Sequence, residues 1–542
     1  MTFGEMEKRM QEKIDDPNVY LNLAEYYLDK NVDLAYLSLE NACFYETDES
    51  RKKDIHQMMT ELNREGFVRV VPATFVILSY QNLDYIKACI ESIRLTCEPS
   101  GYEIVVVDNG SGEEVVSYLK AQNDIKLILN EDNRGFPAGC NQGIEAASNG
   151  NDIFLLNDDT VMLPNSLFCL RMALYSDTKI GAVGAMGSNA PIDQKEPDVD
   201  TLDESISHAL RNNIHKPSMY EKKIWLVGFA LLIKNDVREK VGLLDERFSP
   251  GNYEDNDYCL RILEEGYQNI LCHNCLIFHH GGGSFNKEYN SEKYIQLNTR
   301  NRERFNEKWG ERIDYYTRIR KDLIGYIEET QISKEKNFRI LECGCGMGAT
   351  LLRIKYLYPN AEVYGVELLD NIVGLGKVSC NIVQGNIESL DLNKVVGEPV
   401  DYIVLGDVIE YLADPYKLLR KCRNVLRMHG HIIASIPNIM HYSVMIPLLK
   451  GQDRFQSEGI RDYTHFHNFT FGNIFNMFEQ CGYDIEKADY QIVDRKSFKD
   501  INDKEIEWFQ NIIKSEETAP EYQFNAYQYL ICAKNIDDNS LK

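Results

Sequence analysis

Short apolar runs, separated by stretches with helical spacing, recur in two long parts of the chain. In the first part the runs are residues 74–79, 103–107, 126–129 and 152–156. In the second part they are residues 339–341, 362–366, 402–405 and 431–435. Because strand–helix alternation places helices against both faces of a sheet, each part is predicted to form a parallel sheet covered on both sides.

The first 70 residues have a different pattern, in which apolar positions recur every three or four residues. Ala24, Tyr27 and Leu28 share one predicted helix face. Ala35, Leu39 and Ala42 share another. Such spacing predicts helices, and the segment resembles one tetratricopeptide-type hairpin. Arrays of that type need three or more units, so a helical cap on the next domain is favoured over a partner-binding module.

These patterns divide the 542 residues into several domains, since domains usually hold about 100–200 residues. The predicted parts are a helical, tetratricopeptide-like cap (1–70), a first α/β domain (71–312), a helical linker (313–336) and a second α/β domain (337–542).

Charge and composition exclude several classes of protein. The net charge is −25, which opposes binding to nucleic acid or to an anionic membrane. No run reaches about 18 apolar residues, so no membrane span is expected, and residues 1–16 do not have the pattern of a signal peptide. The 14 cysteines are scattered. A cytoplasmic protein is predicted, either free or peripheral at a membrane.

Polar side chains follow the strands predicted in the first part. Ser79, Asp108 and the pair Asp158–Asp159 all stand where a strand ends. Ligands of parallel sheets bind beyond the carboxyl ends of the strands, and paired carboxylates can hold a divalent cation against a diphosphate. Two carboxylate groups also suit a glycosidase, which needs no nucleotide pocket.

Seven motifs in this part resemble the family 2 inverting glycosyltransferases, in particular the metal-dependent rhamnosyl- and N-acetylglucosaminyl-transferase-like branch. They are residues 75–82, 105–111, 133–141, 156–160, 242–248, 253–257 and 279–284. The resemblance implies a Mn²⁺ or Mg²⁺ ion held by Asp159, Asp158 and His279. Asn157 stands where the family often has a carboxylate, which reduces the charge offered to the metal.

The same resemblance implies roles in transfer of a sugar from a UDP- or dTDP-linked donor. Inverting transfer needs a base for the acceptor hydroxyl, and the match assigns Asp255, with Glu254 as the second candidate. Ser79 and Asp108 would contact the nucleoside. The residues expected to shape the donor pocket are Asn133, Arg134, Gly135 and Asn141. Asp257 and Arg261 are four residues apart and are expected to pair along a helix.

A glycine-rich turn, residues 342–348, opens the second alternating part. Gly344, Gly346 and Ala349 also satisfy the dinucleotide fingerprint G-x-G-x-x-A, so this turn alone fits a dehydrogenase equally well. Glu367, at the end of the next predicted strand, would hold a ribose hydroxyl in either case.

Further motifs in residues 337–482 resemble the class I S-adenosylmethionine (SAM)-dependent methyltransferases. These motifs are residues 385–388, 401–412, 434–438 and 462–467. The implied cofactor contacts are Glu342, Gly344, Gly346 and Gly348 at the methionine part, Glu367 at the ribose, and Asn386 at the adenine. Asp407 is expected at the acceptor side and His465 as the base, although a lone histidine among aromatic residues is more often structural.

The two resemblances together predict an α/β protein with two Rossmann-like nucleotide-binding domains, a metal-dependent glycosyltransferase fold and then a class I methyltransferase fold, after a small helical region. They imply a bifunctional enzyme that adds a sugar to a surface glycan or glycoprotein, with a lipid-linked or protein acceptor such as flagellin, and then O-methylates a glycan hydroxyl. In the alternative, one domain is active and the other is a docking module. Neither the sugar nor the oligomeric state is specified by the sequence.

Overall fold

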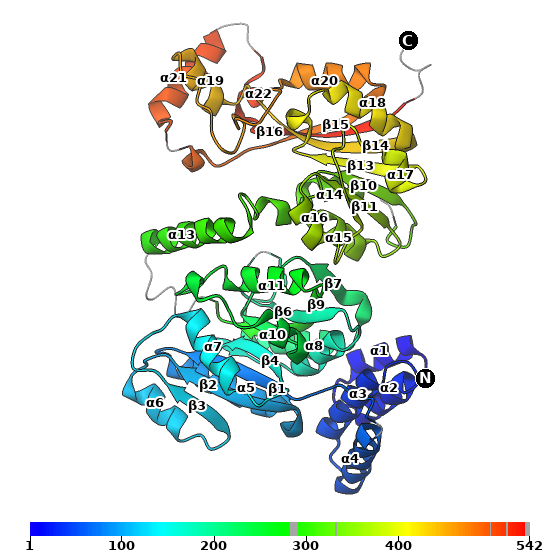
Figure 1. Ribbon diagram of the computed structural model, residues 1–542, viewed down its shortest axis with the longest axis vertical. Coiled ribbons are helices and arrows are strands. Elements are labelled where there is room, and N and C mark those ends of the chain that lie inside the picture. The colour runs from blue at the N-terminus through cyan, green and yellow to red at the C-terminus, as the bar shows by residue number, and fades with distance from the viewer. Residues whose placement is uncertain are drawn as a thin grey trace. The chain divides into compact units, whose positions relative to one another are not determined.

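The computed structural model describes residues 1–64, 66–191, 193–281, 291–330, 333–498, 500–515 and 519–536 (Figure 1). The chain divides into two compact units, Met1–Ile313 and Asp314–Lys542. No helix among the described residues is both long and apolar enough to cross a bilayer.

The first unit is built on a sheet with strand order β3-β2-β1-β4-β8-β6-β9-β5, and β7 pairs with β9. Its strands are β1 (Ala73–Ser79), β2 (Tyr102–Asp108), β3 (Ile125–Leu129), β4 (Asp152–Asn157), β5 (Thr160–Val161), β6 (Ile180–Gly187), β7 (Tyr220–Lys223), β8 (Ala230–Ile233) and β9 (Gln268–His279). Its helices after the N-terminal region are α5 (Leu83–Thr96), α6 (Glu113–Lys120), α7 (Phe136–Ala146), α8 (Ser166–Leu174), α9 (Leu202–Asn212), α10 (Asn235–Val241), α11 (Glu254–Glu264) and α13 (Ser291–Trp309).

Strand direction in this sheet differs from the prediction in part. β1 pairs in parallel with β2 and β4, and β2 with β3, as expected. β8 runs antiparallel to both β4 and β6, so the sheet is mixed. All four residues of β8 are buried. An apolar run buried on both faces reads the same in either direction, so its pattern carries no information on polarity.

The N-terminal region is helical, as predicted, and its four helices are α1 (Phe3–Glu12), α2 (Pro17–Tyr27), α3 (Val32–Tyr45) and α4 (Glu49–Arg64). Side chains cap their first turns, since Asp16 accepts from Asn18 N and Asn31 accepts from Leu34 N. Ala24 is buried as its pattern indicates, whereas Leu28 is 45% exposed.

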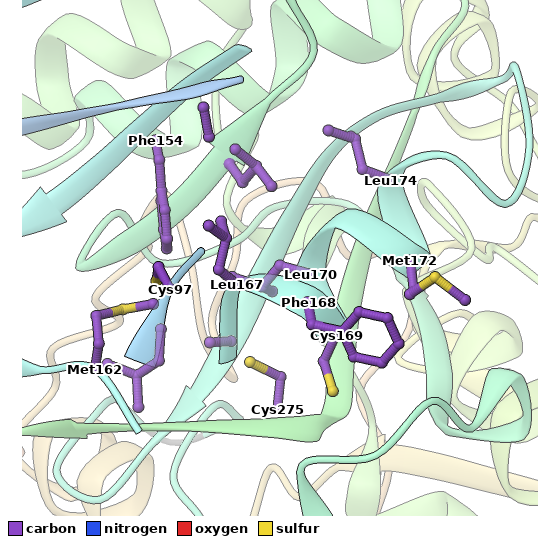
Figure 2. Packing of buried hydrophobic residues seen from close by; sticks show 14 of the residues in the cluster. Cys97, Phe154, Met162, Leu167, Phe168, Cys169, Leu170, Met172, Leu174 and Cys275 are labelled. Atoms are coloured by element: carbon purple, nitrogen blue, oxygen red, sulfur yellow. The ribbon is translucent and has the colours of Figure 1, made fainter. Parts of the chain in front are cut away.

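These helices share one hydrophobic core with the first sheet. Leu23 and Leu37 belong to the same buried cluster as Phe154 of β4 and Cys169 of α8. Figure 2 shows the part of this cluster around Phe154 and α8, where the side chains of Leu167, Phe168 and Leu170 gather. The N-terminal helices therefore form part of the first unit's folded core.

Two buried polar residues of α8 and its N-cap reinforce that junction. Asn165, in a left-handed conformation, donates from Nδ2 to the Tyr20 hydroxyl at 2.7 Å and accepts from the Tyr45 hydroxyl at 2.9 Å. Arg171 is 1% exposed, pairs with Glu40 and donates to the Val71 carbonyl at 2.8 Å. A buried guanidinium needs such partners, because an unpaired buried charge is strongly destabilising.

The second unit has a sheet with strand order β12-β11-β10-β13-β14-β16-β15. Its strands are β10 (Arg339–Cys343), β11 (Glu362–Glu367), β12 (Ile382–Gln384), β13 (Val400–Gly406), β14 (Leu426–Pro437), β15 (Tyr483–Gln491) and β16 (Gln528–Asn535). Its helices are α14 (Lys321–Glu329), α15 (Ala349–Leu357), α16 (Asp370–Gly376), α17 (Leu392–Val396), α18 (Pro415–Val425), α19 (Tyr442–Leu449), α20 (Phe471–Gln480), α21 (Asp503–Ser515) and α22 (Glu521–Asn525).

Numbered within this unit, the strands run 3-2-1-4-5-7-6. Neighbouring strands in the order β12-β11-β10-β13-β14 pair in parallel, and β16 is antiparallel to β14 and β15. The last strands, β15 and β16, therefore complete the second sheet. Both sheets contain a group of parallel strands and carry helices, which confirms the predicted α/β class with two Rossmann-like domains.

Candidate active sites

A carboxylate pair lies at the carboxyl end of β4 in the first unit. Asp158 and Asp159 follow Asn157 in the turn to β5, and their side chains are 7% and 6% exposed. The Asp158 carboxylate accepts from the Tyr80 amide at 3.2 Å. Burial, with the neighbouring Asp159 carboxylate, raises the pKa of Asp158 to about 8. A nearby cation would favour the ionised form of this carboxyl.

Strand pairing brings His279 to the same place. Thr160 of β5 pairs with His279 of β9, and the His279 Nε2 atom lies 3.3 Å from Asp159 Oδ1. The other ring nitrogen, Nδ1, lies 3.0 Å from the Asn189 carbonyl oxygen. Since a carbonyl oxygen only accepts, this contact assigns the proton of a neutral ring to Nδ1 and leaves a lone pair on Nε2.

The residues at this strand end fit a divalent cation. His279 Nε2 and Asn157 Oδ1 are both buried and have no hydrogen-bond partner among the described residues. A positive charge between this nitrogen and the Asp159 oxygen, such as a bound cation supplies, would stabilise the contact. An imidazole whose other nitrogen is bound to a carbonyl is the usual arrangement of a ligating histidine, and carboxylate and amide oxygens complete a set suited to Mn²⁺ or Mg²⁺.

Two further predicted residues lie on the neighbouring strands. Ser79 and Asp108 are register partners at the ends of β1 and β2, and they are 0% and 1% exposed. Asp108 accepts from the Ser111 amide at 3.1 Å. The Ser79 hydroxyl and the second Asp108 oxygen have no partner among the described residues. Two buried polar atoms are thus free to bind a ligand at this edge.

The loop before α7 contains Asn133, Arg134 and Gly135. Asn133 accepts from the Gly135 amide at 2.9 Å, and the Arg134 side chain is exposed. Gly135 has φ +84°, and a Cβ there would meet Ser249 Oγ at 2.8 Å. Only glycine suits that conformation and close approach.

Asn141 does not belong to this loop, because it lies within α7. Its amide donates to the Leu244 carbonyl at 3.0 Å and accepts from the Leu244 amide at 2.9 Å. Asn141 therefore holds the 244–246 segment against α7, a structural role that the motif match did not indicate.

The predicted base lies at the amino end of α11. Asp255 is partly exposed and accepts from the Gly228 amide at 2.9 Å and from the Asn256 amide at 2.8 Å. Burial raises the pKa of Asp255, and these amides oppose the shift. Glu254 is 7% exposed, and burial together with the Asp255 carboxylate raises its pKa well above the ordinary value. One carboxyl of the pair is thus kept protonated at a pH where the other ionises.

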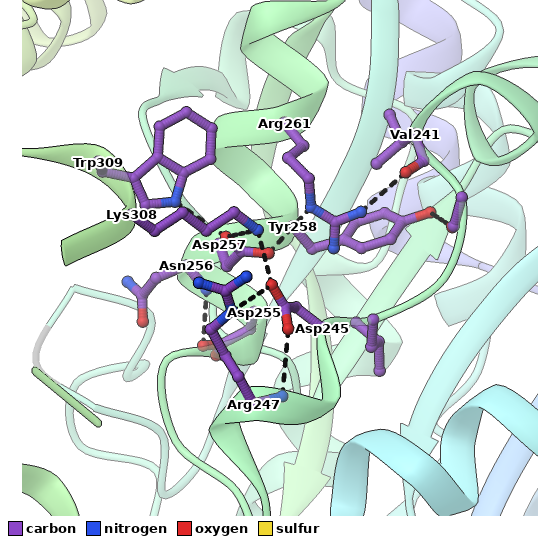
Figure 3. Close-up of polar contacts among 12 residues, drawn as sticks. Val241, Asp245, Arg247, Asp255, Asn256, Asp257, Tyr258, Arg261, Lys308 and Trp309 are labelled. Atoms are coloured by element: carbon purple, nitrogen blue, oxygen red, sulfur yellow. Dashed lines mark hydrogen bonds and ion pairs between the residues drawn. The ribbon is translucent and has the colours of Figure 1, made fainter. Parts of the chain in front are cut away.

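Asp257, one helical turn further, has a structural role as predicted (Figure 3). Its fully buried carboxylate pairs with Arg261 at 2.9 Å and Lys308 at 2.7 Å, and it accepts from Trp309 Nε1 at 2.9 Å. The last two residues lie at the end of α13. Asp257 therefore ties α13 to the helix that carries Asp255.

The dipeptide Gly228–Phe229 connects the two halves of this site, and no pattern in the sequence indicated its role. The Gly228 amide holds Asp255, the Phe229 carbonyl accepts from Asn157 N at 2.9 Å, and the Phe229 ring stacks on His279. The motif at 279–284 is described only to Gly281, so its remaining predicted residues lie outside the described residues.

The glycine-rich turn of the second unit connects β10 to α15. Gly344, Gly346 and Gly348 have φ values of +71°, +55° and +82°. Such angles favour glycine, and the turn brings backbone amides to the carboxyl edge of the sheet. Glu367, at the end of β11, accepts from the Gly346 amide at 3.0 Å.

Glu342 precedes this turn and is 4% exposed. One of its carboxylate oxygens has no partner among the described residues, and burial raises its pKa to about 8. A cationic ligand would lower that pKa by favouring the charged form.

The segment before α14, expected only as part of a linker, contributes to this site. The Tyr316 carbonyl accepts from the Met347 amide at 2.8 Å. Arg320 donates to the Asp407 carboxylate at 3.0 Å, and the Tyr315 hydroxyl lies 3.3 Å from the same oxygen. Polar residues in a segment expected to be a linker look like ordinary solvent-exposed residues, so the sequence did not indicate that Tyr315, Tyr316 and Arg320 belong to this site.

Asn386 and His465 lie in different surroundings. Asn386 is exposed and borders a cavity of about 450 Å³ beyond β12, which is also lined by Gly385, Ser389, Leu390 and Lys394. His465 is half-buried against the edge of the Tyr411 ring, and its Nδ1 atom lies 3.2 Å from the Ile460 carbonyl oxygen.

Comparisons with known proteins assign a family to each unit. The family model "Glycosyl transferase family 2" matches residues 74–220, and the model "Methyltransferase domain" matches residues 341–434. The chain is 21% identical over 172 residues to a malonyl-[acyl-carrier protein] O-methyltransferase of Bacillus cytotoxicus, and the aligned region covers 31% of this chain and 50% of that protein. It is 27% identical over 113 residues to a poly-beta-1,6-N-acetyl-D-glucosamine synthase of Staphylococcus aureus, and this aligned region covers 20% of this chain and 27% of that protein.

The chain thus spans about half of the first relative and about a quarter of the second. Among solved structures, a SAM-dependent methyltransferase from Archaeoglobus fulgidus aligns with a TM-score of 0.29 and 20% identity, over 42% of this chain and 97% of that one. On the two family matches, the chain is a fusion of a family 2 glycosyltransferase domain and a methyltransferase domain.

Proposed function

We propose that the first unit transfers a sugar from a nucleotide-sugar donor, of the UDP-N-acetylglucosamine or dTDP-rhamnose type, with inversion at the anomeric carbon. The observation that supports this most strongly is the buried, unpartnered Nε2 atom of His279 facing Asp159. A Mn²⁺ or Mg²⁺ ion held there by Asp159, His279 and Asp158 would neutralise the charge of the nucleoside diphosphate leaving group.

Other residues of the first unit have matching tasks in this proposal. Ser79 and Asp108 hold the nucleoside through their free polar atoms, while Asn133 and Arg134 border the donor. Asp255 takes the proton of the acceptor hydroxyl, and the Gly228 amide fixes the orientation of its carboxylate.

We propose further that the second unit transfers a methyl group from SAM to a glycan hydroxyl. SAM supplies an already activated methyl group, so the chain's own residues position the two reactants and exclude water. The residues assigned to the cofactor are Glu342, Gly344, Gly346 and Gly348 at the methionine part, Glu367 at the ribose, and Asn386, beside the cavity, at the adenine. Asp407 borders the acceptor side.

The acceptor in this proposal is a surface glycan or glycoprotein, either lipid-linked or a protein such as flagellin. The presence of both domain families on one chain supports a common acceptor. Tethering places the second site at an effective concentration on the order of millimolar for a product that stays attached to a large acceptor.

The proposal is tested with the full-length chain in two assays. Release of UDP or dTDP from the donor should require Mn²⁺ or Mg²⁺, stop with EDTA and be lost in Asp159→Ala. Radiolabelled methyl should pass from SAM to a glycan fraction purified from a strain that lacks the gene. A wild-type chain that shows only one of the two activities would favour the alternative, in which one domain is a docking module.

A further inference from the structure

Glu410 is a buried carboxylate two residues after Val408, whose side chain packs against the glycine-rich turn. It lies in the short 3₁₀ helix Ile409–Tyr411 that follows β13, and it is 1% exposed. Neither carboxylate oxygen has a hydrogen-bond partner among the described residues. An unsatisfied buried carboxyl costs several kcal/mol of solvation, so its retention needs an explanation other than stability.

Packing places this 3₁₀ helix next to the proposed cofactor site. A Cβ on Gly344 would lie 2.7 Å from the Cγ2 atom of Val408, so the residues after β13 contact the glycine-rich turn directly. Asp407, three residues before Glu410, has φ +52°, a left-handed backbone conformation that is uncommon for residues other than glycine. Such strain is concentrated at functional sites.

Charged groups from several elements surround Glu410. The carboxylates of Asp407 and Asp462 and the guanidinium of Arg320 are its electrostatic neighbours, and the Tyr315 hydroxyl lies 3.3 Å from the Asp407 carboxylate. Arg320 is already bound to Asp407 at 3.0 Å and Asp322 at 2.7 Å. The surroundings are therefore rich in negative charge, which suits a cationic sulfonium and opposes an anionic acceptor.

Residues 455–467 form a segment that is hydrogen-bonded to the backbone of Glu410 and carries exposed aromatic side chains. The Phe466 and His467 amides donate to the Glu410 carbonyl at 2.9 and 3.2 Å, which fixes the segment to the 3₁₀ helix. The exposed aromatic residues of the segment are Phe455 (62%), Tyr463 (64%) and Phe466 (71%). Such rings offer apolar faces on which the C–H face of a sugar can pack.

We infer that Glu410 is the proton acceptor of the methyl transfer, and that the acceptor group is therefore a neutral hydroxyl and not a carboxylate. This inference rests on the proposed function. An oxygen lone pair of the hydroxyl attacks the methyl carbon, the S–CH₃ bond breaks with its electron pair remaining on sulfur, and the hydroxyl proton passes to Glu410. The products are a methyl ether, S-adenosylhomocysteine and protonated Glu410.

Two observations favour Glu410 over His465 for this role. Glu410 has both oxygens unpartnered, whereas the His465 Nδ1 atom contacts the Ile460 carbonyl. Burial, with the Asp407 carboxylate, raises the pKa of Glu410 well above its ordinary value, and a higher pKa makes the carboxylate a stronger base. A carboxylate acceptor has no proton to lose and would be repelled by Asp407, Glu410 and Asp462.

The test compares full-length wild type with Glu410→Gln and, in case that variant misfolds, Glu410→Asp. Glu398→Gln is the control, because Glu398 is an exposed carboxylate of the same unit whose side chain is 76% exposed. The methyl acceptor is the glycan fraction from a strain that lacks the gene. Binding of S-adenosylhomocysteine, measured by calorimetry, reports whether each variant is folded.

We expect Glu410→Gln to bind S-adenosylhomocysteine as the wild type does but to transfer methyl about 100-fold more slowly. Wild-type turnover should rise with pH as Glu410 loses its proton, and the variant should lack that rise. The incorporated methyl should resist mild alkali, as an ether does. A Glu410→Gln variant that transfers methyl as fast as the wild type, or a methyl ester product that is labile to alkali, overturns this inference but leaves the proposed function standing. A wild-type chain that methylates no glycan fraction overturns the proposed function as well.

Discussion

The ring of Phe229 stacks on the ring of His279, with centroids 4.7 Å apart and planes 17° apart. The preceding residue, Gly228, donates its amide to Asp255. One dipeptide thus supports both the proposed metal ligand and the proposed base. Displacement of this dipeptide should impair metal binding and proton transfer together.

Asp159→Asn should abolish donor turnover at the Mn²⁺ concentrations that just saturate the wild type. The amide keeps the shape of the carboxylate but removes the negative charge that faces His279, so affinity for Mn²⁺ should fall at least tenfold. Nucleotide release measured against Mn²⁺ concentration reports the change. Unaltered metal dependence in this variant would contradict the assignment of Asp159.

Asp255→Asn should lower kcat by about 100-fold or more, with UDP binding in Mn²⁺ retained, because a general base contributes that much. Asp257→Asn provides the matched comparison on the same helix. Asp257 is buried among Arg261, Lys308 and Trp309, so its loss should cost about 3 kcal/mol of stability. Thermal unfolding and steady-state kinetics distinguish the two effects, and equal kcat values for wild type and Asp255→Asn would exclude Asp255 as the base.

Gly346→Ala should eliminate binding of S-adenosylhomocysteine. A Cβ at Gly346 would lie 2.5 Å from the Tyr316 carbonyl oxygen, and φ is +55°. The turn must therefore move. Gly374→Ala is the control, since Gly374 lies in α16 with open space around its Cβ position, and alanine favours a helix. Calorimetric titration of both variants provides the measurement, and normal affinity in Gly346→Ala would show that the turn does not contact the cofactor.

His215 should make the stability of the first unit depend on pH in mild acid. This side chain is fully buried between the Tyr27 and Tyr220 hydroxyls, and burial lowers its pKa from 6.5 to about 3. Below pH 6.5 the unfolded chain binds a proton that the folded chain does not. The contribution of His215 to the free energy of unfolding should therefore fall by about 1.4 kcal/mol per pH unit as the pH decreases toward 3.

His215→Gln should reduce that slope between pH 6.5 and 5, where few carboxylates titrate. Unfolding of the wild type and the variant by denaturant at several pH values provides the comparison. Identical pH slopes for the two proteins would contradict a buried, neutral His215.

The strands that lead into each site were predictable, because apolar runs and strand-end polar residues are local signals. Ser79, Asp108 and Asp158–Asp159 do lie together at one sheet edge, since parallel strands end on the same side. The direction of β8 was not predictable, because its uniformly buried run fits either orientation.

Residues that act through long-range contacts were also missed. Phe229 and Gly228 are apolar, and only the fold brings them to His279 and Asp255. Glu410 lay within a recognised motif, but its lack of partners appears only once the surrounding residues are placed. A sequence therefore indicates which strand ends carry chemistry more readily than it indicates which side chains support them.

Calorimetric titration of the full-length chain, first with UDP in the presence of Mn²⁺ and then with S-adenosylhomocysteine, tests the central claim most directly. Two nucleotide-type sites on one chain predict that each ligand binds one-to-one, that Asp159→Asn abolishes only the first binding, and that Gly346→Ala abolishes only the second. Absence of both binding isotherms in the wild-type chain would contradict the account.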